Sequence, residues 1–141
     1  MNSGINEYVE ACIWLDATLA QVPITGSSGA FEHPAPQDQA YPLVTWQYAG
    51  AKDVAEVAAQ RIWAEVVMQV AAWGKGGSTV ALAAIADEID RRLQQASGST
   101  TNALIYSCTR EQVLSFPEVA SGVAYRRLGG LYRLVIQKKG A

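Results

Sequence analysis

The side chains that most often perform acid–base or nucleophilic chemistry are scarce in this sequence. Its one histidine, His33, lies in a proline-rich connection, where no nearby serine, cysteine or acidic residue completes a recognisable catalytic motif. The two cysteines, Cys12 and Cys108, lack the paired spacing of a zinc site and are expected to be buried and unpaired. The sequence therefore predicts no catalytic residue, no metal ion and no cofactor, as in a protein that is not an enzyme.

One glycine-rich segment has the position of a phosphate-binding loop, because it joins a predicted strand to a predicted helix. It reads Gly74-Lys75-Gly76-Gly77-Ser78-Thr79. A phosphate-binding loop requires a glycine, four intervening residues and then Gly-Lys-Ser/Thr, so that the lysine and the hydroxyl reach the same phosphates. Here Lys75 precedes the glycines and the spacing is too short. We expect a flexible turn, with Ser78 capping the next helix, and no bound nucleotide.

Aromatic and basic residues are the other groups whose pattern bears on ligand binding. The aromatic residues are scattered over several predicted elements and do not alternate with basic ones, which argues against a surface that stacks bases. Arg91-Arg92 has acidic neighbours and is expected to form local ion pairs. Arg126-Arg127 is compatible with DNA binding, but a subunit contact or a solvated pair is the favoured interpretation.

Charge and composition indicate a globular protein. Half of the 141 residues are apolar and 17% are charged, which at this length predicts a single domain over residues 1–141. The net charge of −2 argues against a protein dedicated to binding duplex DNA. No segment reaches the ~20 apolar residues of a membrane span, and no signal peptide is recognisable, so we expect a soluble, cytoplasmic protein.

Hydrophobic periodicity predicts two amphipathic helices. The first covers about 6–20, with Glu7, Glu10 and Asp16 largely outside its apolar stripe. The second follows Ser78 and ends near Ala96, where Gly98 is suited to a left-handed cap. The stripe of the first helix comprises Ile5, Tyr8, Val9, Cys12, Leu15 and Leu19, and that of the second Leu82, Ile85, Ala86, Ile89 and Leu93.

Strands are predicted between and after the helices. They are expected at 30–33, 43–48, 61–73, 104–112 and 131–137. Residues 49–59 are ambiguous between a helical turn and a loop, and 115–117 is expected to lead into an irregular segment. Gly129-Gly130 fits either a tight hairpin or a bulge in one strand. Because no regular helical crossovers separate the strands, this order predicts an α+β fold, a mainly antiparallel sheet with two helices packed on one face.

The strand at 61–73 has an outward face that is unusually apolar for contact with water. That face carries Trp63, Glu65, Val67, Gln69 and Trp73. Either a second packing surface within the chain or a neighbouring subunit would explain it.

Four motifs occur along the chain in a distinctive order. A polar loop from Asp38 leads through Tyr41-Pro42 into an apolar strand, and an Arg-led strand ends in Val70-Ala71-Ala72-Trp73. The helix segment 84–93 follows, and 127–133 precedes the last strand. This order and spacing resemble those of phage tail-completion, or tail-terminator, proteins, over most of the chain.

The resemblance implies a non-catalytic virion protein assembled in the host cytoplasm. Such subunits form a ring, commonly a homohexamer, that caps the head-proximal end of the tail tube, ends its polymerisation and joins tail to head. The implied partners are further copies of the chain, the tail tube protein and a head-completion or neck protein. Genomic DNA is expected to pass through the ring without sequence-specific binding, and no membrane is involved.

A closed ring requires two different contact surfaces on each subunit. Acidic residues dominate as far as Glu56, whereas basic residues gather near the C-terminus, at Arg126, Arg127, Arg133, Lys138 and Lys139. We expect the outward face of 61–73 and the basic last strand to supply the two surfaces. The candidate interface residues are Trp63, Glu65, Trp73, Lys75, Arg126, Arg127 and Arg133. Two alternatives stay open: another head–tail connector or neck protein, and an unrelated small enzyme or ligand-binding domain.

Overall fold

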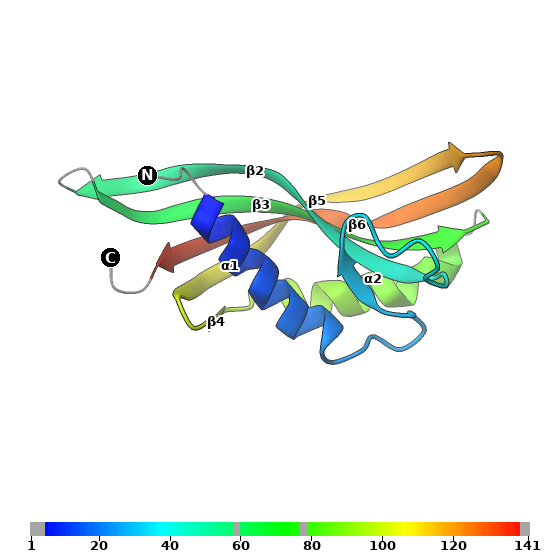
Figure 1. The fold of residues 1–141 in the computed structure, drawn as a ribbon, viewed down its shortest axis with the longest axis horizontal. Coiled ribbons are helices and arrows are strands. Elements are labelled where there is room, and N and C mark those ends of the chain that lie inside the picture. The colour runs from blue at the N-terminus through cyan, green and yellow to red at the C-terminus, as the bar shows by residue number, and fades with distance from the viewer. Residues whose placement is uncertain (1–4, 58–59, 77–78, 139–141) are drawn as a thin grey trace.

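Six strands form one sheet, and both helices lie against the same face of it (Figure 1). The structure is a computed structural model that describes residues 5–57, 60–76 and 79–138. The helices are α1 (Ile5–Leu15), which continues into the π-helical turn η1 (Asp16–Ala20), and α2 (Thr79–Leu93). The strands are β1 (Ala30–Glu32), β2 (Leu43–Val57), β3 (Gln60–Lys75), β4 (Gly98–Ser99), β5 (Ala103–Ala120) and β6 (Val123–Lys138).

The sheet has the strand order β1-β2-β3-β6-β5-β4. Only β1 and β2 are parallel, and every other pair of neighbours is antiparallel. The predicted α+β fold is therefore confirmed. The long hairpins β2–β3 and β5–β6 extend past the helices toward opposite ends of the molecule (Figure 1).

The core lies between the two helices and the inner face of the sheet. Alternate residues of β3 and β6 point into it, as the period of two in a strand requires. The fully buried residues include Leu15 and Leu19 of the first helical segment, Leu82, Ile89 and Leu93 of α2, and Val66, Met68, Val70, Leu134 and Ile136 of the sheet. The predicted apolar stripe of the second helix is thus confirmed for its large side chains.

The first helix is rotated about its axis relative to the prediction. Glu7 and Glu10 are buried, whereas Val9 and Ile13 are 47% and 48% exposed. Thr100 donates a hydrogen bond to the carboxylate of Glu10, so this acidic side chain is stabilised inside. The prediction that Glu7 and Glu10 face water and Val9 faces the core is therefore wrong.

Two predicted breaks in the strands are also absent, because residues 49–57 continue β2 and the segment 115–117 lies inside β5. Of the two alternatives for Gly129-Gly130, the tight hairpin is wrong: the pair lies inside the continuous strand β6, and its pairing with β3 and β5 has no register shift at these residues. The chain turns instead at Ser121 and Gly122, which have φ angles of 52° and 77°. Pro117 is compatible with this arrangement because β5 is at the sheet edge there, where a strand can lack a backbone donor.

The prediction of a left-handed cap at Gly98, after the second helix, is wrong. Gln95, with a φ of 60°, adopts the left-handed conformation, and Gly98 lies in β4. Gly98 is required for a different reason: a Cβ at this position would lie 2.7 Å from Nε1 of Trp14. The predicted cap Ser78, like Lys139 at the other end of the chain, lies outside the described residues.

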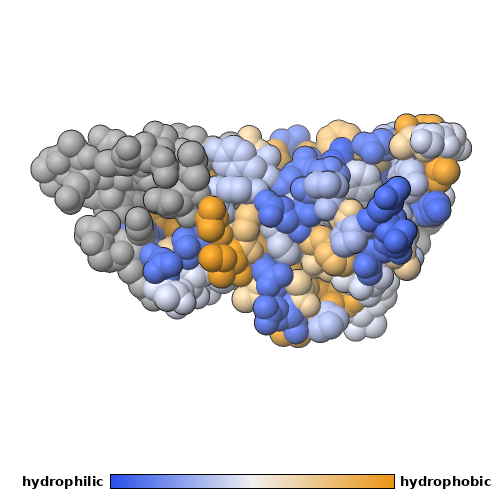
Figure 2. Space-filling view, in the orientation of Figure 1, coloured by the Kyte–Doolittle hydropathy of each residue, from blue (hydrophilic) through white to orange (hydrophobic). Residues whose placement is uncertain are grey.

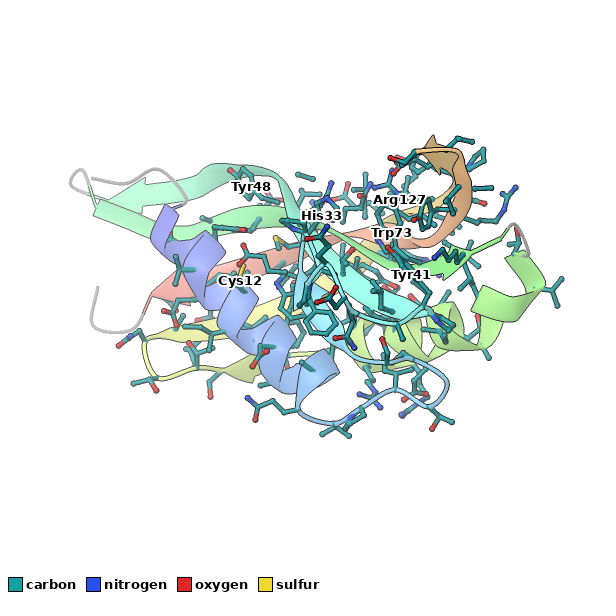
Figure 3. The ribbon with its side chains drawn as sticks, turned by 45° about the vertical axis from the view of Figure 1, so that its right-hand side comes forward. Cys12, His33, Tyr41, Tyr48, Trp73 and Arg127 are labelled. Carbon is teal, nitrogen blue, oxygen red and sulfur yellow. The ribbon has the colours of Figure 1, made fainter. Side chains whose placement is uncertain are left out.

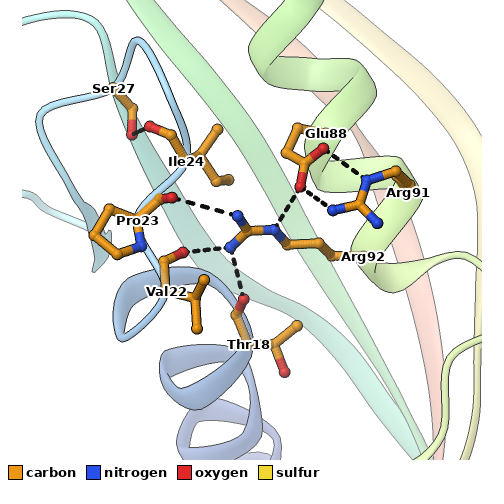
Figure 4. Close-up of polar contacts among 8 residues, drawn as sticks. All are labelled: Thr18, Val22, Pro23, Ile24, Ser27, Glu88, Arg91 and Arg92. Carbon is orange, nitrogen blue, oxygen red and sulfur yellow. Dashed lines mark hydrogen bonds and ion pairs between the residues drawn. The ribbon is translucent and has the colours of Figure 1, made fainter.

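Arg92 fastens α2 to the end of the first helical segment (Figure 4). Its guanidinium donates to the backbone carbonyl oxygens of Thr18 (3.1 Å), Val22 and Pro23 (3.3 Å). The carbonyl of Thr18 lies in the last helical turn and those of Val22 and Pro23 follow it, at a helix end where carbonyls lack partners within the helix and where a cation is favourable. Nε of Arg92 also donates to Glu88, at 2.8 Å.

The carboxylate of Glu88 accepts hydrogen bonds from both Arg91 and Arg92. Arg91 donates to the same carboxylate, so the predicted local ion pairing is confirmed. Hydrogen bonds from Arg91 and Arg92 lower the pKa of Glu88 to about 2. The carboxylate is therefore ionised throughout the neutral range, and it keeps the guanidinium of Arg92 oriented toward the carbonyls.

We expect Arg92→Met to lower the free energy of unfolding by about 2 kcal/mol, because it leaves three carbonyl groups without their charged donor. Arg91→Met is the matched control, since Arg91 bonds the same carboxylate but its side chain is 71% exposed. The control should change stability by less than about 0.5 kcal/mol. Urea unfolding checks both, and equal effects would show that the carbonyl contacts contribute nothing.

Gly129 lies where any side chain would collide with the neighbouring strand β3. A Cβ at this position would lie 2.0 Å from the carbonyl oxygen of Val70 and 2.5 Å from Cα of Ala71, both backbone atoms. Neither atom can move without separating β3 from β6. A glycine is therefore needed in the middle of a strand that would otherwise be stabilised by a side chain.

Gly129→Ala should lower the free energy of unfolding by about 3 kcal/mol, because the strands must separate to admit a methyl group. Gly74→Ala is a control in the same sheet, where the nearest atoms to the new Cβ would all belong to the side chain of Leu82, at 3.0 Å (Cδ2) and 3.4 Å (Cδ1 and Cγ). We expect the control to change stability by less than about 1 kcal/mol. A Gly129→Ala protein as stable as the wild type would refute this account of the glycine.

Candidate assembly surface

The two contact surfaces expected from the sequence, on β3 and on the basic last strand β6, lie next to each other on one face of the sheet. β3 pairs with β6 so that Trp73 lies opposite Arg127 and Val67 lies opposite Arg133. Their side chains share the outer face of the sheet, away from the helices. The expectation that β3 and the basic last strand form two separate contact surfaces is therefore wrong. Arg126 lies on the other, helix-facing side of β6, because neighbouring residues of a strand alternate.

Trp73 is the centre of a stack of planar side chains on this outer face (Figure 3). The ring of His33 lies parallel to it, with centroids 5.8 Å apart. The guanidinium of Arg127 lies 4.8 Å from the Trp73 ring and 5.1 Å from that of Phe116. The indole Nε1 donates to Oγ1 of Thr45 at 2.7 Å.

The stack explains the aromatic side chain on the outward face of β3. Trp73 is only 7% exposed, because the connection after β1, Arg127 and the neighbouring strands cover it. Of the two explanations that the sequence allowed, a second packing surface within the chain therefore applies to Trp73. Trp63 belongs to the part of β3 in which only the backbone is described.

Charged residues border the stack, and most have partners within the chain. Arg127 donates to Gln69 at 3.0 Å. Arg133 pairs with Glu65 at 2.8 Å and with Glu111 at 3.0 Å, and its side chain stays 45% exposed. Lys75, at the end of β3, is exposed. The charged groups around the stack are thus mostly paired within the chain, although Nε of Arg127 is buried without a hydrogen-bond partner among the described residues.

A cavity of about 290 Å³ lies between the stack and the connection that follows β1. His33, Tyr41, Trp73 and Tyr125 contribute to its walls. The rings of Tyr41 and Tyr125 are 5.3 Å apart, and burial raises the pKa of Tyr41. Within the described part of the chain, no three histidine, cysteine or acidic side chains are grouped so that they could hold a metal ion.

A second and larger concavity lies beside α1. This α1 groove, of about 690 Å³, is bordered by Val9, Ile13, Phe31, Pro34 and Pro36, and by the acidic residues Asp16 and Glu32. Tyr8 donates a hydrogen bond to Glu32. Cys12 also borders the groove, and burial raises the pKa of its thiol to about 11, so the thiol is protonated at neutral pH. The groove is therefore apolar with acidic margins, and its thiol is a poor nucleophile.

The β5–β6 hairpin carries a second group of exposed apolar side chains. We call residues 113–128 the β5–β6 arm. Val113 is 57% exposed, Phe116 40% and Val119 73%. Hydrophobic atoms gather over the middle of α1 and again toward the end of the molecule where the hairpin turns (Figure 2).

Sequence reasoning missed both of these apolar surfaces. Val9 and Ile13 are four residues apart on a helix, a spacing that marks a second apolar stripe beside the buried one. The arm was overlooked because Pro117 and the Gly129-Gly130 pair suggested irregular chain. The available signal for a strand was the enrichment of this segment in apolar, β-branched and aromatic residues, Val113, Leu114, Phe116 and Val119.

The chain was compared with protein families and with curated proteins. A family model described as tail completion protein gp17 matches residues 15–137. No curated protein gives a match. None of the described helices has the length and apolar character needed to cross a membrane.

We predict that Arg127→Met lowers the free energy of unfolding by about 1–2 kcal/mol, because the cation between two aromatic rings is lost. Lys75→Met, at an exposed position near the same end of β3, should change it by less than about 0.5 kcal/mol. In a double-mutant cycle with Phe116→Leu, the two losses should be non-additive by about 0.5 kcal/mol or more. Additive losses would mean that the Arg127–Phe116 contact is not energetically coupled.

Proposed function

Because the chain belongs to the tail completion protein gp17 family, we propose that it assembles into a ring at the head-proximal end of a phage tail. It is a structural component of the tail. In our proposal the ring caps the tail tube, ends its polymerisation and provides the surface to which a head-completion or neck protein binds. The family match over residues 15–137 is the observation that carries this proposal.

The exposed apolar side chains support self-assembly. Val9 and Ile13 lie on one surface and Val113 and Val119 on another, and all are close to half exposed or more. A ring built from identical subunits needs two different surfaces that are complementary to each other. The chain offers two such surfaces, and a homohexamer is the stoichiometry that we propose.

The outer face of β3 and β6 is proposed to face the other tail proteins. Glu65, Lys75 and Arg133 would take part directly, while Trp73 keeps Arg127 in place beneath the surface. Trp63 and Arg126 are the remaining candidates for protein contacts. Partly exposed ion pairs of this kind are weakened by salt, so contacts through this face should depend on ionic strength.

Genomic DNA is proposed to pass through the ring without sequence-specific binding. The net charge of −2 is unsuited to neutralising many phosphates at once. On this proposal the protein acts by surface complementarity alone, without a catalytic group, a metal ion or a cofactor.

Removing the gene from its phage tests the position in the tail. A tail terminator should leave tails of uncontrolled length, measured by negative-stain electron microscopy of the lysate, and a plasmid copy should restore uniform tails. Tails of normal length that are unattached to heads would instead identify a neck protein, which is the alternative function within the same structure. Normal, complete virions would overturn both assignments.

A further inference from the structure

The helix-facing side of the sheet continues past the helices into the arm. The pairing of β5 with β6 places Val113, Pro117 and Val119 on the same side as Leu134 and Ile136. Leu134 and Ile136 are fully buried by the helices, whereas Val113, Pro117 and Val119 are exposed. The arm is therefore an extension of the core surface that its own chain leaves uncovered.

The arm also has a free strand edge. β4 pairs only with residues Leu104 and Ile105 of β5, so within the described chain the outer edge of β5 has no strand partner over 111–120. An apolar strand with a free edge is a surface that other chains recognise. Arg126 adds positive charge to the helix-facing side, opposite Pro117.

The α1 groove has the complementary character. Val9 and Ile13 form an apolar stripe on the side of α1 that its own sheet does not use. The charged residues that border the groove, Asp16 and Glu32, are both acidic. A helix with an apolar stripe is what covers the rest of this sheet face, so the groove offers the arm the same kind of packing as the core.

The turn of the arm lies at one end of the molecule, whereas α1 crosses the middle of the sheet (Figure 1). They cannot meet within one copy of the folded chain. A contact between them joins one copy to the next, head to tail, which is the kind of contact that closes a ring.

We propose that the β5–β6 arm of one copy docks into the α1 groove of the next. Val113 and Val119 pack against Val9 and Ile13 of the neighbour, and Arg126 approaches the acidic margin of the groove. This inference rests on the proposed function, since it names the contact that holds the ring together.

Cross-linking of two variants that each carry one accessible cysteine tests the contact. Val119→Cys and Ile13→Cys are each made with Cys12→Ser, which removes the native thiol of the groove, whereas Cys108 is fully buried and stays. The two proteins are mixed and treated with a short bismaleimide. We expect a heterodimeric product from this pair and at least tenfold less from Ile13→Cys with Val22→Cys, because Val22 is 60% exposed and lies beside Arg92, at the end of α2 that is remote from the arm.

The assembly state of charged variants gives an independent measurement. Val119→Asp should weaken association at least about tenfold in native mass spectrometry, since the contact would bury an unpaired carboxylate. Val22→Asp, at an exposed position beside Arg92 and away from the arm, is the matched control and should assemble like the wild type. Val119 is 73% exposed, so its variant should unfold at the same urea concentration as the wild type.

The outcomes separate this inference from the proposed function. A wild-type ring with no cross-link between positions 119 and 13, or with Val119→Asp still assembled, would overturn the arm-in-groove contact and leave the ring proposal standing. Cross-links of Val119→Cys with itself would indicate a two-fold contact instead and would also overturn it. A wild-type chain that stays monomeric alone and on purified tail tubes would overturn both.

Discussion

The length of the sheet relative to its helices is the constraint from which most of the structure follows. A strand of 16 residues such as β3 extends about 50 Å, whereas a helix of 15 residues such as α2 extends about 22 Å. Two helices on one face therefore cover only part of the sheet. The hairpins must extend beyond them, and apolar residues on that side of a hairpin stay exposed until something else covers them.

Because the helices cover a limited area, their placement must be fixed by specific contacts. Arg92 joins α2 to the carbonyls at the end of the first helical segment. Tyr132, buried in β6, donates to Asp90 of α2 at 2.9 Å, and Asp90 also pairs with Arg110 of β5. These polar contacts surround an apolar core, which by itself would allow a helix to slide along the sheet. The helices are thus held over the middle of the sheet, and the arm is left free.

Features that depend on local periodicity could be predicted from the sequence. Features that depend on contacts between residues far apart in the chain could not. The stripe of α2 and the alternation in β3 are local, and both were predicted correctly. Glu10 is buried because Thr100, ninety residues away, donates to it. Position 129 of β6 must be a glycine because a Cβ there would lie 2.0 Å from the Val70 carbonyl oxygen of β3. Neither partner can be inferred from the residues adjacent in sequence. In the same way, the sequence placed Trp73 on the correct face of β3 but did not predict which residues cover it.

The two faces of the sheet differ in whether their exposed side chains already have partners within the chain, and this difference indicates different roles. On the outer face the aromatic and charged side chains largely satisfy one another, as in the stack of His33, Trp73 and Arg127 and in the pairing of Arg133 with Glu65. That face gains little free energy from being buried, because breaking or desolvating existing ion pairs offsets new contacts. The arm and the α1 groove expose apolar groups that gain free energy whenever water is removed. This distribution favours self-association through the exposed apolar groups. It leaves the charged outer face for salt-sensitive contacts to other tail proteins.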